Sequence, residues 1–165
     1  MKSRLPMNLL SMHPYLQLLL ISMLPIVELR GGIPYGVMSL GLPFSVVYPL
    51  CVLGNILPVP FLIKFSKAVL SWLAEKRVLG GFFQKIIDRA DAKAKTIGKF
   101  ELLGLFLFVA IPLPGTGAWT GSLIAAILRL RLVPAFLVIT LGVLTSGFIM
   151  GILSYGLLGA FGIIF

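Results

Sequence analysis

The sequence has little charge and very few acidic residues. Charged residues make up 12% of the 165 residues, and only 5 residues are Asp or Glu. An ordinary soluble domain has about 25% charged residues, and a water-exposed surface with so few charges would not keep a protein dispersed. This composition excludes a soluble enzyme.

Cysteine and histidine are almost absent as well. The single cysteine, Cys51, excludes an intramolecular disulfide, and the single histidine, His13, has no partners with which to form a metal site. No Ser-His-Asp or Cys-His arrangement can be assembled from the remaining residues. We therefore expect no enzymatic activity, no metal and no cofactor.

Apolar and basic residues are abundant. Hydrophobic residues make up 59% of the chain, and 14 Lys and Arg give a net charge of +9. An excess of basic residues in a soluble protein would suggest nucleic-acid binding, but cytoplasmic loops of membrane proteins are also rich in Lys and Arg. The apolar composition favours the second interpretation, with membrane lipids and no nucleic acid as partners.

Four apolar blocks organise the chain. They cover residues 15–27, 33–63, 102–128 and 132–165. A helix needs about 20 apolar residues to span a bilayer. Residues 46–63 meet this length roughly and residues 132–155 meet it comfortably, so we expect each to form a transmembrane helix.

A basic stretch, residues 64–101, separates the two halves and is predicted to be cytoplasmic. Apolar residues recur in it at helical spacing: Phe82, Phe83, Ile86, Ile87, Ala90, Ala94 and Ile97. The pattern predicts an amphipathic helix, either lying on the membrane surface or packed under the transmembrane helices.

The third block is interrupted by turn-forming residues: Pro112, Pro114, Gly115 and Gly117. Proline and glycine at this density do not hold a helix, so each flank is too short to span alone. The block is either a broken transmembrane helix or a re-entrant hairpin. Arg129 and Arg131 follow it at once, and a hairpin keeps them on the cytoplasmic side with the other basic residues. The charges favour the hairpin.

The first half repeats this pattern around Gly31, Gly32 and Pro34. We expect an all-α integral membrane protein with a single domain over residues 1–165. Two inverted-topology repeats, 14–63 and 102–165, would each contain a re-entrant helical hairpin and a transmembrane helix, joined by the cytoplasmic amphipathic helix. Inverted repeats place substrate near the midplane between discontinuous helices. Lys2 and Arg4 would then lie outside, against the positive-inside rule.

Glu28 and Arg30 are the only charged residues between Arg4 and Lys64. A charge at membrane depth costs about 2.5–3.5 kcal/mol on insertion scales and usually serves function. If the chain is extended at the Gly31-Gly32 tip, both side chains face one cavity. Glu28 is then a candidate proton carrier, and Arg30 a candidate ligand for an anionic headgroup. The alternative is a structural ion pair that holds the hairpin tip.

Broken helices present further candidate groups. Unpaired amides at half-helix N-termini around Tyr35 and Trp119 would favour an anion. Thr116, Thr120 and Ser122 could donate hydroxyl protons to the same substrate. Alternatively, these hydroxyls bond the backbone carbonyls that the break sets free.

Three motifs carry a resemblance to a known family: Pro25-Ile-Val-Glu-Leu-Arg-Gly-Gly-Ile-Pro34, Leu53-Gly-Asn-Ile-Leu-Pro-Val-Pro60 and Ile111-Pro-Leu-Pro-Gly-Thr-Gly-Ala-Trp-Thr-Gly121. The chain resembles the prokaryotic small multidrug export proteins and, more distantly, the DedA/VTT superfamily, whose members are associated with moving lipid carriers. This resemblance implies a multi-pass protein of the prokaryotic plasma (inner) membrane. It implies that Glu28 is the essential acid and that Arg30 binds a headgroup. The second hairpin lacks the arginine that DedA proteins carry there.

Three hypotheses follow. The first is a transporter or flippase that moves an anionic amphiphile, preferably a polyprenyl (undecaprenyl) phosphate, with proton coupling through Glu28. The second is a proton-coupled exporter of lipophilic cations, which ranks lower because Arg30 would repel a cation. The third is a non-transporting membrane scaffold. Glycine-rich helix faces leave a homo-oligomer open.

Overall fold

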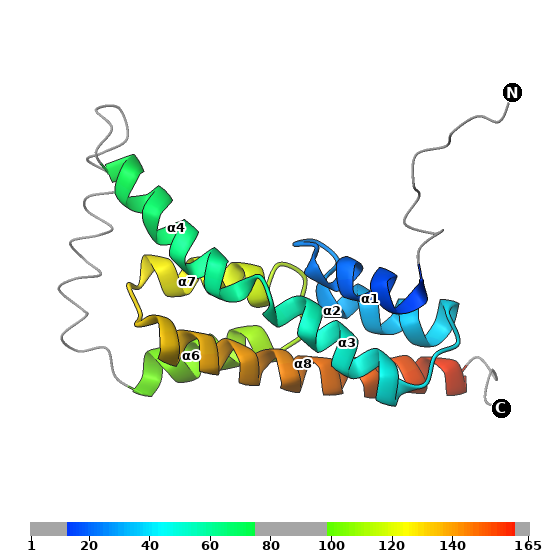
Figure 1. The fold of residues 1–165 in the computed structure, drawn as a ribbon. Coiled ribbons are helices and arrows are strands. Elements are labelled where there is room, and N and C mark those ends of the chain that lie inside the picture. The colour runs from blue at the N-terminus through cyan, green and yellow to red at the C-terminus, as the bar shows by residue number, and fades with distance from the viewer. Residues whose placement is uncertain (1–12, 75–98, 161–165) are drawn as a thin grey trace, which may run out of the picture. The chain divides into compact units, whose positions relative to one another are not determined.

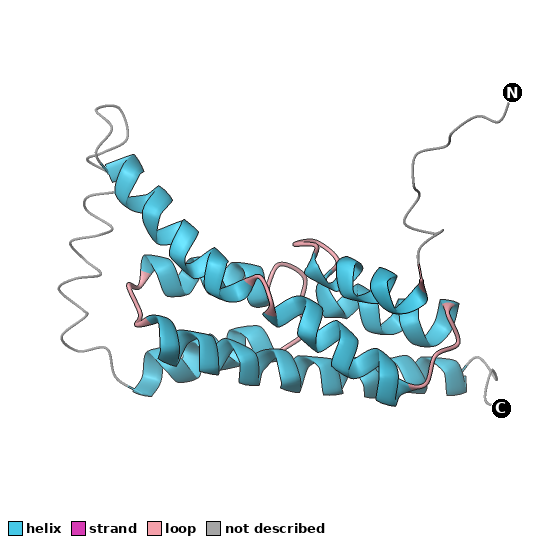
Figure 2. Ribbon diagram, in the orientation of Figure 1, coloured by secondary structure: helices cyan, strands magenta, loops and turns pink. Residues whose placement is uncertain are grey.

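The computed structural model describes residues 13–74 and 99–160, and within these ranges the regular elements are helices (Figure 2). They divide into two compact units. The first contains the residues up to Asn55 and those from Gly147 onward, and the second contains Ile56–Ser146. The amphipathic helix predicted around residues 82–97 lies outside the described residues.

Two helical spans are long and apolar enough to cross a membrane, Phe44–Val69 and Leu132–Gly156. They include the two stretches that the sequence predicts to be transmembrane, which confirms that prediction by length and composition. Only 39% and 33% of their most apolar windows are buried. A core helix of a soluble protein would be mostly buried, so these apolar surfaces require another cover.

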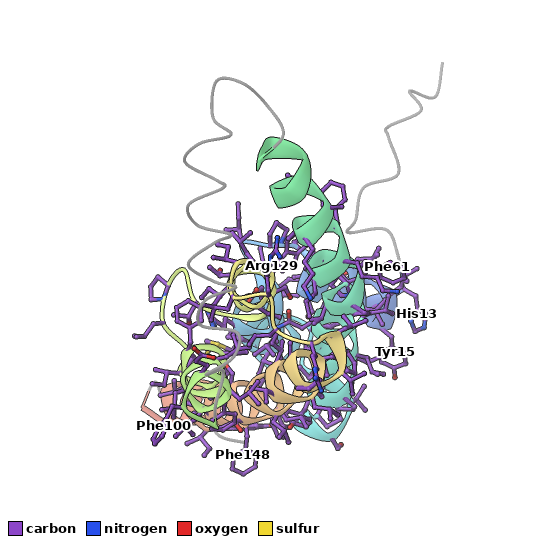
Figure 3. All side chains as sticks on the ribbon, turned by 90° about the vertical axis from the view of Figure 1, so that its left-hand side faces the viewer. His13, Tyr15, Phe61, Phe100, Arg129 and Phe148 are labelled. Atoms are coloured by element: carbon purple, nitrogen blue, oxygen red, sulfur yellow. The ribbon has the colours of Figure 1, made fainter. Side chains whose placement is uncertain are left out.

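Large apolar side chains are exposed both on these spans and outside them. Phe61 and Phe100 project from the surface (Figure 3) and are 70% and 87% exposed. Val133 and Ile152 lie on the second span and are 66% and 61% exposed. Lipid chains are the cover that such surfaces need, and the protein is therefore a membrane protein.

The first unit begins with a helical hairpin (Figure 1). Its first arm is α1 (Pro14–Met23), which starts on a proline, as helices often do. The arm ends at Leu24, whose ψ of 136° is extended because Pro25 follows it. The second arm, α2 (Glu28–Pro34), packs against α1.

The second arm continues past its proline as a wider helix. Pro34 has no N–H to donate within α2, and η2 (Tyr35–Ser39) follows as a π-helix. The Leu40 N–H bonds the Tyr35 carbonyl at 3.1 Å, which is the five-residue spacing of a π-turn. The unit is completed by α3 (Phe44–Ile56) and by the end of α8 (Leu132–Ala160).

The structure corrects the predicted tip of this hairpin. Gly31, Gly32 and Pro34 lie inside α2, and the turn between the arms is formed by residues 24–27. A Cβ at Gly32 would collide with the Ser22 hydroxyl and lie 3.1 Å from the Cys51 sulfur. The glycine therefore permits close packing of α2 instead of ending it, which outweighs its helix cost of about 1 kcal/mol.

The second unit contains α4 (Val59–Ala74), α6 (Lys99–Ala110), α7 (Ala118–Ile127) and the first part of α8. Here α7 packs against both α4 and α6 (Figure 1). A Cβ at Gly121 or at Gly142 would lie 2.7 Å from Val109, so small residues allow close approach to α6.

The predicted break in the second half is confirmed. Pro112, Pro114, Gly115 and Gly117 all lie in the loop between α6 and α7. The Thr116 N–H bonds the Leu113 carbonyl at 3.2 Å, and Gly115 has a φ of +81°. Proline followed by a glycine of positive φ is the signature of a type II turn.

Candidate functional site

Glu28 is the central residue of the candidate site. It opens α2, and its side chain is only 3% exposed. Its φ is +49°, a left-handed conformation that is uncommon for residues other than glycine. Such conformations cost about 1–3 kcal/mol and cluster at functional sites. A buried acid in this conformation is the feature of the first unit that most needs a functional explanation.

Other polar side chains are buried in the same unit. Gln17 is 4%, Ser22 0% and Asn55 1% exposed. The Tyr35 hydroxyl donates to the Gln17 Oε1 at 3.1 Å, which links η2 to α1. In contrast, Asn55 Oδ1 is buried without a hydrogen-bond partner, and the buried Ser22 Oγ has the Cys51 thiol, a weak partner, beside it. Buried polar atoms in this state are costly and call for an explanation.

The packing of the second arm against α3 sets which residues face one another. A Cβ at Gly36 would lie 2.7 Å from Val47, and one at Gly32 would lie 3.1 Å from Cys51. Gly32 lies one turn before Gly36 in the second arm, whereas its neighbour Cys51 lies one turn after Val47 in α3. The second arm and α3 therefore run antiparallel.

Arg30 lies in the first turn of α2 and is half-buried. The extended tip predicted for Glu28 and Arg30 is wrong, because α2 already begins at Glu28 and residues two apart in a helix do not share a face. The Glu28 carboxylate still acts electrostatically on the Arg30 guanidinium. Both charges therefore belong to one local site.

The second hairpin uses its hydroxyls internally. Thr116 Oγ1 lies 2.9 Å and 2.8 Å from the carbonyls of Ile111 and Leu113. Thr120 Oγ1 donates to the Gly115 carbonyl at 3.0 Å, and Ser122 Oγ to that of Ala118 at 2.6 Å. Of the two roles that the sequence leaves open, the structure shows backbone bonding, so these protons are not directed at a ligand.

Of the two predicted half-helix N-termini, the structure contains one. Trp119 lies in the first turn of α7, as expected, and is half-exposed. Tyr35 is the first residue of η2, which continues α2 without a break, so the N-terminus predicted around it is wrong. Trp119, Thr116 and Thr120 belong to the second unit, whereas Glu28 and Arg30 belong to the first.

Sequence reasoning missed three buried polar side chains of the first unit, Gln17, Ser22 and Asn55. Asn55 carries a weak signal, since it is an amide inside an apolar run. It also missed Lys67, whose Nζ donates to the Leu130 carbonyl at 2.6 Å. Within residues 13–74 and 99–160, no group of three His, Cys, Asp or Glu side chains could hold a metal ion.

Comparison with known proteins identifies a family. A family model described as "Putative small multi-drug export protein" matches residues 28–149. The matched segment begins at Glu28 and covers more than half of the chain. No curated protein and no solved structure matches. The more distant resemblance to DedA/VTT proteins stays a prediction.

Proposed function

The chain belongs to the small multi-drug export protein family, and from this membership we propose that it is a proton-coupled membrane transporter of an amphiphilic substrate. Glu28 is the coupling residue in this proposal. The protein performs no chemical catalysis and needs no cofactor, and it works in the prokaryotic plasma membrane. A homo-oligomer is compatible with this function.

The observation that carries the proposal is the burial of Glu28. Its carboxylate is 3% exposed in a hairpin whose arms are apolar, and its backbone is held in the left-handed region. A charge at membrane depth costs about 2.5–3.5 kcal/mol on insertion scales. Together with the free-energy cost of the left-handed backbone, this cost is large for a residue with a purely structural role. A carboxylate that gains and loses a proton during transport accounts for it.

The neighbouring arginine favours an anionic substrate. While Glu28 is ionised, its carboxylate acts on Arg30 and offsets the positive charge. Protonation of Glu28 leaves Arg30 with an uncompensated charge, which attracts a phosphate through the planar guanidinium fork. Proton binding and anion binding thereby support each other. A polyprenyl phosphate such as undecaprenyl phosphate is the substrate that we would test first.

The lengths of the hairpin arms support a re-entrant arrangement. The arms α1 and α7 have 10 residues each, and α6 has 12. At 1.5 Å per residue these arms are about 15–18 Å long, roughly half of a bilayer core of about 30 Å. In this proposal both hairpins end inside the membrane and the two repeats have inverted topology.

The basic residues of the second unit support a cytoplasmic position for residues 64–101. Lys67 on α4 bonds the Leu130 carbonyl, so the basic end of α4 lies beside the turn that carries Arg129 and Arg131. A re-entrant hairpin of α6 and α7 keeps these charges on one side, as the positive-inside rule requires. A single crossing by the third block would separate them.

Export of lipophilic cations is the second candidate function. The family description favours it, and so does the internal use of the Thr116 and Thr120 hydroxyl protons, which removes two donors for an anion. Arg30 decides between the candidates, because it attracts an anion and repels a cation. The scaffold hypothesis differs from both in predicting no transport.

The decisive experiment is transport into proteoliposomes under an imposed pH gradient. Labelled polyprenyl phosphate and a fluorescent lipophilic cation are tested with wild type, Glu28→Gln and Arg30→Gln. We expect gradient-dependent movement of the phosphate by wild type and its loss in both variants. Glu101→Gln is the matched control, since it neutralises the other described acid at the start of α6.

The outcomes separate the candidates. Movement of the cation but not the phosphate, with Arg30→Gln at least as active as wild type, would replace the first candidate by the second. If no probe moves above protein-free vesicles, both transport functions fail for these substrates. Equal loss in Glu28→Gln and Glu101→Gln would remove the special role of Glu28.

A further inference from the structure

The second unit gathers positive charge at one of its ends. Lys64 and Lys67 lie on α4, and Arg129 and Arg131 lie in the turn between α7 and α8. The Lys67 Nζ donates to the Leu130 carbonyl at 2.6 Å, so the lysines of α4 are brought to this turn. The four side chains, which we call the basic cluster, thus come from two segments that are distant in the sequence.

Two members of the basic cluster act directly on each other. The carbonyl that holds the Lys67 ammonium belongs to the residue after Arg129, and the two positive charges repel each other. In the described part of this unit, Glu101 on α6 is the only acidic side chain, and one carboxylate does not neutralise four cations. Like charges held this close raise the free energy of the unit, and a bound anion would lower it.

Capping of α7 does not account for both cations. The Leu130 carbonyl takes one of the three protons of the Lys67 ammonium, and a cation near a helix C-terminus is favourable. Arg129 is exposed, and its φ of +51° is a conformation that glycine adopts without strain. The favourable interaction with the helix dipole is smaller than this backbone cost. Strained residues of this kind occur at ligand clamps, so the arginine points to a bound ligand.

The surface beside the basic cluster is apolar. Phe61 (Figure 3) and Phe65 lie one turn apart on α4 and are 70% and 67% exposed. Lys64 lies between them in the sequence, and Val133, which is 66% exposed, follows the turn on α8. Cations beside exposed apolar side chains match the two parts of a phospholipid, its charged headgroup and its acyl chains. A free phosphate ion would use the cations alone.

We propose that the basic cluster binds the phosphodiester headgroup of an anionic phospholipid, with Lys67 and Arg129 as its principal ligands. The planar guanidinium fork binds two phosphate oxygens, and the ammonium adds a point charge with further donors. Basic pockets between membrane helices bind such headgroups, and Lys64 and Arg131 add attraction at the rim. The acyl chains cover the exposed phenylalanines of α4.

The bound lipid joins α4 to the turn after α7 and so stabilises the second unit. This inference goes beyond the proposed function and does not depend on it. The proposed coupling residue and its arginine, Glu28 and Arg30, belong to the first unit, and lipid binding to the second unit requires no transport.

Thermal unfolding of the full-length protein in detergent tests the proposal. Phosphatidylglycerol, phosphatidylcholine and inorganic phosphate are titrated separately. We expect phosphatidylglycerol to raise the melting temperature saturably, by about 5 °C or more, because a ligand of the folded state stabilises it. Phosphatidylcholine carries a compensating cation and inorganic phosphate carries no acyl chains, so each should give a much smaller increase.

Two variants locate the site. Arg129→Gly removes the guanidinium without disturbing the fold, because glycine accepts the positive φ. It should be at least as stable as wild type without lipid and yet gain little from phosphatidylglycerol. Lys67→Gln keeps a donor for the Leu130 carbonyl and removes the charge, and it should lose most of the increase. Lys2→Gln is the matched control, since it removes one positive charge far from the basic cluster in the sequence, and it should respond like wild type.

Several results would overturn the inference. Wild type that gains no stability from phosphatidylglycerol excludes the site, and an equal gain from phosphatidylcholine or inorganic phosphate excludes an anionic lipid as its ligand. Arg129→Gly and Lys67→Gln that respond like wild type would exclude the basic cluster. An equal loss in Lys2→Gln would show that net charge attracts the lipid. Stabilisation by phosphatidylglycerol that requires Lys67 and Arg129 supports the site even if none of the transport probes moves.

Discussion

At the scale of single residues, the first unit combines features that are individually unfavourable. Glu28 is buried and left-handed, Asn55 has an unpartnered buried oxygen, and glycines occupy α2. Gly32 has a clear structural cause, because a side chain there would meet Ser22 of α1 and Cys51 of α3. Glu28 has no such cause, and this contrast is why we assign function to it.

Replacement of Gly32 by alanine tests the close approach of α2. The new Cβ would collide with Ser22 and crowd Cys51, and we expect a loss of about 1–3 kcal/mol from overpacking. The measurement is thermal unfolding in detergent. Gly104→Ala in α6 is the control, because nothing lies within 4 Å of its Cβ position. Helix propensity should make that variant more stable by up to about 1 kcal/mol. Equal effects would contradict the packing described here.

At the scale of elements, helix ends follow from local chemistry. Pro25 stops α1 and Pro34 converts α2 into η2. The end of α7 is different, because it has no glycine. The Leu130 N–H bonds the Ala125 carbonyl at 3.0 Å and the Arg129 N–H that of Ala126 at 3.1 Å. This is a Schellman motif with Arg129 at the position that usually holds glycine.

Arg129 therefore carries a backbone cost. Its φ is +51°, and the left-handed conformation costs roughly 1–2 kcal/mol for a residue with a Cβ. Arg129→Gly should stabilise the protein relative to Arg129→Val by at least this amount, since β-branching makes the conformation worse. Both variants remove the guanidinium, so their difference in thermal unfolding reports the backbone alone. Two variants of equal stability would exclude this account of the helix end.

At the scale of the whole molecule, each unit has a helical hairpin and part of each long span. The spans are mostly unburied, and apolar side chains are exposed throughout the described residues. These features need lipid around them. The hydrogen bond from Lys67 Nζ to the Leu130 carbonyl also places the basic end of α4 beside the turn between α7 and α8.

This proximity of the two basic segments predicts the membrane topology. Lys64 and Arg131 are both exposed, and the bond places them at the same end of the unit. Lys64→Cys and Arg131→Cys should react with a membrane-impermeant maleimide from the cytoplasmic side only. Wild type is the control, because its single cysteine, Cys51, is buried. Labelling of the two positions from opposite sides would show that the third apolar block crosses the membrane.

The sequence by itself determined the class of protein. Sparse charge and long apolar runs required a membrane, and two of the runs were long enough to span it. The break at Pro112–Gly117 was also visible, and Glu28 stood out as a charge within an apolar region. These properties are local, because they depend on composition, on backbone donors lost at proline and on the cost of one charge in lipid.

Only the tertiary structure decided where the first hairpin turns and what its second arm packs against. Gly31 and Gly32 suggested a break in isolation, but both lie within α2, where Gly32 packs closely against Ser22 and Cys51. The contacts of Gly32 with Cys51 and of Gly36 with Val47 depend on the register of two antiparallel helices, which no local pattern encodes. The tertiary structure likewise decided that the hydroxyls of Thr116 and Thr120 bond backbone carbonyls of the loop. A side chain's partners are set by packing between elements, and the sequence specifies that packing only through all of its residues together.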